Sequence, residues 1–267
     1  MSGDEVVVTL IALVLGIGAW GVWLVRAASV ATLRTGPPPV TQLAGTLVAL
    51  AAVIFLILKF CAADDVRNAP QYLFMYLMLG LAWLYGASLL FPIAGLSARD
   101  DIIERRNAAA VPTWMGAMTG VALCYGGANI GNGPGWWVVV FSAALATLAL
   151  LLVWLAMGQW AGVADEVALD RDPAAGIRLG GLLAACGVVF GGAVTGDWVS
   201  ASATVIDFGV KAWTAGPIVM AAVLVEHLQR PTPERPRAPV SAAGLMPALA
   251  YLAAAGASVY LAKDWTW

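Results

Sequence analysis

Long apolar stretches alternate with short polar segments along the whole chain. The polar segments contain most of the charged residues, prolines and glycines, as loops leaving a bilayer do. A hydrocarbon core of about 30 Å is crossed by about 20 helical residues, so each apolar stretch is long enough for one transmembrane helix. The pattern predicts spans near 6–26, 41–63, 71–95, 108–130, 136–160, 174–196, 203–226 and 242–263.

The composition agrees with a membrane-embedded chain. Of the 267 residues, 61% are hydrophobic and 11% are charged, whereas a soluble domain carries about 25% charged residues. The sequence therefore predicts an all-α integral membrane protein, with residues 1–267 forming one membrane domain. The net charge of −2 and the lack of a basic run give no indication of nucleic-acid binding.

Basic residues are distributed unequally between the two sets of loops. The loops after the first, third, fifth and seventh spans, with the adjoining span end, hold Arg26, Arg34, Arg99, Arg105, Arg106, Arg171, Arg230, Arg235 and Arg237. The other side has Lys59, Arg67 and Lys263. Because cytoplasmic loops are enriched in arginine and lysine, the first set is predicted to be cytoplasmic and both termini non-cytoplasmic. The first charged side chains, Asp4 and Glu5, are acidic where a signal peptide would be basic, so we expect the first apolar stretch to be a retained helix rather than a cleaved signal peptide.

An internal repeat of about 66 residues is visible in the middle of the chain. Residues 106–110 resemble residues 171–175, and residues 125–132 resemble residues 190–197, both at an offset of 65. Weaker matches extend the pattern to both ends, which predicts four units near 1–65, 66–132, 133–197 and 198–267. Each unit would contain two spans, so all four would share one orientation in the membrane.

Glycines recur four residues apart in the second span of the two central units. The pairs are Gly116 and Gly120, Gly127 and Gly131, Gly176 and Gly180, Gly187 and Gly191, and Gly192 and Gly196. Small residues at this spacing allow helix backbones to approach closely in lipid. We therefore expect the glycine-rich second helices to be packed inside and the bulkier first helices outside.

The repeat motifs resemble the bacterial inner-membrane family called domain of unknown function 350 (YjfL-like). The resemblance covers roughly 98–267 and rests on Asn107-Ala108-Ala109-Ala110, its counterpart Asp172-Pro173-Ala174-Ala175, the early aspartate Asp207, and the ending Asp264-Trp265-Thr266-Trp267. The entry asparagine is absent from the first and fourth units. The resemblance implies a multi-pass protein of the bacterial inner membrane without an established activity, and a link to polyamines or envelope maintenance.

Among the charged residues within predicted spans, Asp207, Lys211 and Arg178 are the candidates for a function, because a charge costs about 2.5–3.5 kcal/mol at the centre of a span. Asp207 and Lys211 are four residues apart on one helix face, so they could form a cation-attracting or proton-linked site, or simply neutralise each other. Arg178 lies about one turn inside its span. We expect it to snorkel to anionic headgroups rather than to contact a ligand.

Polar residues also gather at the predicted outer ends of the glycine-rich helices. Asn129, Asn132 and Asp197 would either surround the mouth of a pathway or form turns.

Two functions fit these features. The first is a channel or transporter for small cations or polyamines, with four units around an axis normal to the membrane. The alternative is a scaffold or accessory subunit whose proline-rich cytoplasmic loop docks a protein partner through Arg230, Glu234, Arg235 and Arg237. Membrane lipids and further copies of the chain are the other expected partners.

Enzymatic chemistry is the least supported alternative. The spans offer almost no convergent acid, base or nucleophile. The single histidine and three cysteines lack metal-ligand spacing, so we expect no catalytic residues, no metal site and no cofactor.

Overall fold

The computed structural model describes residues 1–31, 39–230 and 239–262. Within these ranges the regular structure is helical and contains no strand. The α-helices are α1 (Gly3–Leu13), α2 (Trp20–Ala31), α3 (Val40–Phe60), α4 (Asp64–Arg67), α5 (Pro70–Ser88), α6 (Ala110–Ala128), α7 (Trp136–Ala161), α8 (Val163–Ala168), α9 (Pro173–Ala193), α10 (Ala201–Ala212), α11 (Ala215–Gln229) and α12 (Met246–Ala262). Other helical turns are η1 (Val14–Ala19), η2 (Phe91–Ala94), η3 (Ala98–Glu104) and η4 (Ser241–Leu245).

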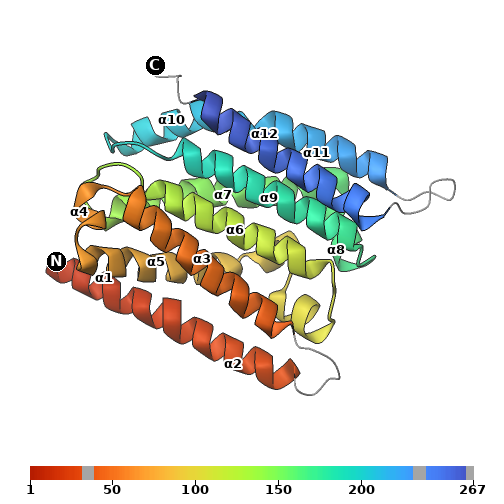
Figure 1. Cartoon of the computed structure of the whole chain (residues 1–267), viewed down its shortest axis with the longest axis horizontal. Helices are drawn as coiled ribbons and strands as arrows, with labels where there is room; N and C mark the ends of the chain where they lie inside the picture. Colours follow the sequence, from red (N-terminus) through yellow and green to blue (C-terminus); the bar gives the residue numbers. More distant parts are fainter. Residues whose placement is uncertain (32–38, 231–238, 263–267) are drawn as a thin grey trace.

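The long helices lie side by side in two layers (Figure 1). One layer is a row in the order α3, α6, α9, α12, with α3 and α12 at opposite edges. Behind it, α5 packs on α3 and α6, α7 packs on α6 and α9, and α11 packs on α7, α9 and α12. The continuous α1–η1–α2 helix packs on α5. Over the described residues the helices thus form an open row rather than a ring around a central axis.

Five helices are long and apolar enough to cross a membrane, judged over the described ranges. They are Gly3–Val30, Val40–Phe60, Trp136–Ala161, Pro173–Ala193 and Ser241–Ala262, and the bent α10–α11 pair would make a sixth. An all-helical protein with several apolar, membrane-length helices is thus what the sequence predicted. The first helix begins, and α12 ends, at the same end of the molecule (Figure 1). We call this the outer end, following the predicted orientation.

The seventh predicted span is not one straight helix. It is divided into α10 and α11, which meet at an angle of 46°. Pro217 has no N–H, so it cannot donate to the Trp213 carbonyl, which accepts from the Gly216 N–H at 2.8 Å instead. The hydroxyl of Thr214 also bonds to the Lys211 carbonyl, at 3.2 Å. These local bonds replace the regular helical ones and explain the bend.

The centre of the molecule is the contact between α6 and α9. A side chain at Gly116 would collide with the backbone carbonyl of Gly180, and one at Gly127 would collide with the carbonyl of Gly191. Because these positions are glycine, the two backbones touch directly. Nearly all of α9 is buried, as expected for an inner glycine-rich helix. The second helices of the outer units, α3 and α12, lie at the edges of the row and are mostly unburied, so the expectation of inner second helices holds for the central units alone.

Candidate functional site

A polar pocket of about 150 Å³ opens at the outer end, where α6 and α9 terminate. The pocket is lined by parts of α4, α7 and α10 and by the segments that follow α6 and α9. Its polar lining residues are Asp65, Tyr76, Asn129, Asn132, Ser142, Thr195, Asp197, Trp198, Thr204, Asp207 and Lys211. Residues far apart in the sequence therefore meet in one place.

Two loops form the rim and are bonded to each other. The Gly196 N–H donates to the Ile130 carbonyl at 2.9 Å, and the Trp198 N–H donates to the Asn132 carbonyl at 2.8 Å. Gly196 has a φ of +135°, a backbone conformation that favours glycine. The sequence makes this pairing possible because both helices end in a Gly-rich turn.

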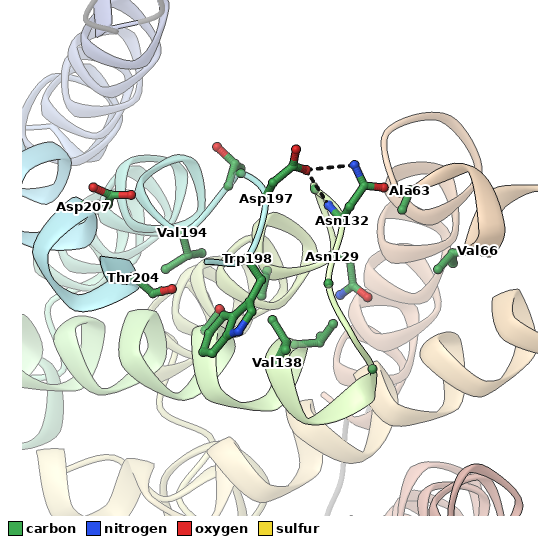
Figure 2. Close-up of a pocket in the computed structure, with 18 of the residues that line it drawn as sticks. Ala63, Val66, Asn129, Asn132, Val138, Val194, Asp197, Trp198, Thr204 and Asp207 are labelled. Carbon is green, nitrogen blue, oxygen red and sulfur yellow. Dashed lines mark hydrogen bonds between the residues drawn. The ribbon is translucent and has the colours of Figure 1, made fainter. Parts of the chain in front are cut away.

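Asn132 and Asp197 face each other across these loops (Figure 2). The backbone N–H and the side-chain amide of Asn132 both donate to Asp197 Oδ1, at 2.7 and 2.9 Å. The other carboxylate oxygen of Asp197 accepts no hydrogen bond from the described part of the chain. Asn129 is buried and donates to the Tyr125 carbonyl at 2.8 Å. The three predicted outer-mouth residues thus stabilise turns and also line the pocket.

Asp207 and Thr204 approach the pocket from the opposite side, on α10 (Figure 2). Both Asp207 and Lys211 are exposed. No ion pair joins the two within the described residues, although they lie one turn apart. Their charges are therefore available to a bound solute.

The aromatic ring of Trp198 is held in place inside the pocket. Trp137 and Phe141 pack edge-on against it, with ring centroids 5.1 and 5.6 Å away. Tyr76 contributes a second aromatic ring to the lining. Aromatic faces attract cations, so these rings add to the attraction of the carboxylates.

Three carboxylates and one ammonium group line the pocket, which leaves an excess of negative charge. Asp65 was not among the residues that sequence reasoning selected as a site, although it occupies the position 67 residues before Asn132 in the repeat. Its contribution becomes evident only when α4 is placed beside the two rim loops. The arrangement is suited to attracting a cation from the outer side.

A second polar cluster lies near the inner end, and it corrects the expectation for Arg178. This side chain does not snorkel, since the residue is 1% exposed. Its guanidinium donates twice to Glu226, at 2.9 and 2.5 Å, once to Glu166 at 3.3 Å and once to the Ala243 carbonyl at 2.9 Å. The charge is neutralised inside the protein, which makes snorkelling unnecessary.

Arg230 extends this cluster towards the inner surface. It donates to Glu166 at 3.1 Å and to the Ala161 carbonyl at 2.7 Å. Burial raises the pKa of the Glu166 carboxyl above its ordinary value, against the opposing effect of the Arg230 hydrogen bond. The other predicted docking residues, Glu234, Arg235 and Arg237, lie outside the described residues.

The two entry motifs hold the backbone just before or at the start of α6 and α9. Asn107 is buried, accepts from the Ala109 N–H at 2.9 Å and donates to the Val167 carbonyl at 2.7 Å. Asp172 accepts from the Ala174 N–H at 3.0 Å, which caps α9. Asn107 and Asp172 each follow a non-glycine residue with positive φ, Arg106 at 52° and Arg171 at 54°.

Comparison with known proteins adds no functional assignment. No family model, curated protein or solved structure matches this chain.

Proposed function

We propose that the chain crosses the membrane eight times, as four tandem two-helix units that lie side by side. The order α3, α6, α9, α12 in one layer supports this, since these are the predicted second helices of the four units. Asn107 and Asp172, 65 residues apart, each accept from the backbone N–H two residues later, which supports the two central units. The resemblance to the family of unknown function 350 stays a prediction.

We propose further that the protein is a transporter for small organic cations such as polyamines. In this structure its substrate site would be open to the outside. The observation that carries this proposal is the outer pocket with Asp65, Asp197 and Asp207 in its lining. These carboxylates do not form a cluster that could hold a metal ion in the described part of the chain. They come from α4, from the loop after α9 and from α10, so each could face a different ammonium group of one cation.

The layer beneath the pocket is closely packed. Tyr125 is buried, and its hydroxyl donates to the Tyr76 carbonyl at 2.6 Å. The direct backbone contact between α6 and α9 leaves no room for a solute between them. This packing favours a transporter that alternates between states over an open channel.

The bend between α10 and α11 supplies a candidate moving element. Discontinuous helices frequently form the substrate site of secondary transporters, and short breaks absorb the change when one part rocks against another. Here α10 carries Asp207 and Lys211 into the pocket, and α11 carries Glu226 into the inner cluster. One broken helix thus connects the outer site with the inner ion pairs.

Uptake of labelled spermidine and of monovalent cations into liposomes containing the purified protein tests the proposal. We expect spermidine uptake above that of empty liposomes, and a several-fold reduction in Asp207→Asn. Unchanged uptake in that variant would remove Asp207 from the pathway. The absence of uptake of either class by folded protein would contradict transport.

The scaffold alternative is favoured by one observation, the closed interior between α6 and α9. A protein that only organises the membrane needs such packing and no pathway. It would give no uptake and would still retain a cytoplasmic partner during mild purification.

A further inference from the structure

An apolar groove runs along the face of the row formed by α3, α6, α9 and α12. It encloses about 520 Å³ and adjoins the outer pocket, with which it shares Ala193, Thr195 and Lys211. Its lining residues are Ile57, Leu123, Gly127, Ile130, Gly187, Val188, Val189, Gly191, Gly192, Ala193, Thr195, Lys211, Thr214, Ser258, Val259 and Ala262.

The shape of the groove follows from the glycine packing of α6 and α9. Gly127, Gly187 and Gly191 have no side chains, so the floor is backbone. Ile57 of α3 and Val259 of α12 contribute to its two sides. From Gly187 to Ala193 the helical rise covers about 9 Å, which is enough to hold part of an extended acyl chain.

One end of the groove is polar and carries a positive charge. Lys211 and Thr214 lie there with Thr195. Both hydroxyls already donate, Thr195 to the Gly192 carbonyl at 2.8 Å and Thr214 to the Lys211 carbonyl at 3.2 Å. The Lys211 ammonium is exposed and makes no hydrogen bond or ion pair with any residue that the structure describes. It is therefore the available donor for a negatively charged group.

We propose that this groove binds an anionic phospholipid, with the phosphate on Lys211 and one acyl chain along the glycine floor. An apolar groove with a cation at its outer end, unpaired among the described residues, complements the acyl chain and the negatively charged headgroup of such a lipid. The lysine stem can lie along the apolar lining while its ammonium reaches the headgroup layer. Lys211 also lines the outer pocket, but the lipid would lie in the groove outside it, so the proposal goes beyond cation transport.

Thermal unfolding of the full chain in mild detergent tests the site. The wild type is compared with added phosphatidylglycerol or phosphatidylcholine of identical acyl chains. We expect phosphatidylglycerol to raise Tm by several degrees more than phosphatidylcholine. Lys211→Gln should abolish this difference, and the control Lys59→Gln should keep it, because Lys59 bonds to the Arg67 carbonyl away from the groove.

Two variants that fill the groove, Val188→Phe and Leu123→Phe, probe the acyl chain from different helices. Each should reduce the number of phosphatidylglycerol molecules retained in native mass spectrometry, so a folding failure of one leaves the other informative. Equal stabilisation by the two lipids, or full retention of the preference in Lys211→Gln, would overturn the proposal. A dimer in detergent that either phenylalanine variant dissociates would also overturn it, since a second copy would then occupy the groove.

Discussion

Arg178 is a buried charged residue whose guanidinium pairs with a buried carboxylate at the inner end. Its side chain is 2% exposed, and that of Glu226 is 1% exposed. A buried ion pair is not by itself strongly stabilising, because both charges lose their hydration. Removal of one partner is costly, however, since it leaves the other charge buried without compensation. The cluster therefore makes α9, α11 and α8 dependent on one another.

We expect Arg178→Leu to lower the free energy of unfolding by about 3–5 kcal/mol. The measurement is chemical or thermal unfolding of the purified protein in detergent. Arg99 provides a matched control, because its side chain is 72% exposed in its pair with Glu104. Arg99→Leu should cost about 0–1 kcal/mol. Equal losses in the two variants would contradict the buried cluster.

The raised pKa of Glu166 predicts a pH dependence with a definite sign. The folded protein holds the Glu166 proton more tightly than the unfolded chain does. The stabilising effect of this proton is therefore complete below the ordinary glutamate pKa, and it is lost as pH rises to the raised pKa of Glu166. Tm measured across this window should fall more steeply in the wild type than in Glu166→Gln. Parallel slopes would exclude Glu166 as the source.

Among the helix pairs, the contact between α6 and α9 places the two backbones closest together and sets how their ends are arranged. The helices meet through backbone atoms at Gly116 and Gly127, so even one methyl group lacks space. Overpacking of this kind costs about 1–3 kcal/mol. The two helices also end in the paired rim loops, and their packing consequently fixes the shape of the outer pocket.

Alanine substitutions test this contact. We expect Gly116→Ala and Gly127→Ala each to lower the free energy of unfolding by about 1–3 kcal/mol. Gly45 and Gly86 lie in helices with nothing within 4 Å of an added Cβ. Gly45→Ala and Gly86→Ala should be neutral or stabilise by up to about 1 kcal/mol. A uniform effect at all four positions would show that the close contact does not form.

The sequence predicted most elements because apolar length and loop chemistry are local signals. The ends of α7, at Trp136 and Ala161, lie within one residue of the predicted span. The bend near Trp213 was missed because the apolar run continues through it. The partners of Arg178 were missed because Glu226 lies 48 residues away in the sequence. The sequence selected four residues that line the acidic pocket, Asn129, Asn132, Asp197 and Asp207. It did not select Asp65, because only the packing of α4 brings that carboxylate to the pocket.

For the whole molecule, the proposed uptake of cations requires that the end with the acidic pocket faces the outside of the cell. The exposed residue Asn68 follows α4 near the outer pocket, and the exposed residue Asp170 follows α8 near the inner cluster. In a Cys61→Ser background, Asn68→Cys should react with a membrane-impermeant maleimide on intact cells. Asp170→Cys should react only after permeabilisation. The reverse pattern would contradict the orientation derived from the arginine distribution.

In the proposed function, the outer pocket binds a small organic cation through its carboxylates. Equilibrium binding of labelled spermidine to the purified protein tests it most directly, with Asp65→Asn set against Asp64→Asn. Asp65 lines the pocket, whereas its exposed neighbour Asp64 pairs with Arg67 outside it. We predict a five- to tenfold weaker Kd for Asp65→Asn, since a lost exposed charge contact is worth about 1 kcal/mol, and an unchanged Kd for Asp64→Asn. No spermidine binding by the wild type, or equal effects of the two substitutions, would contradict the account.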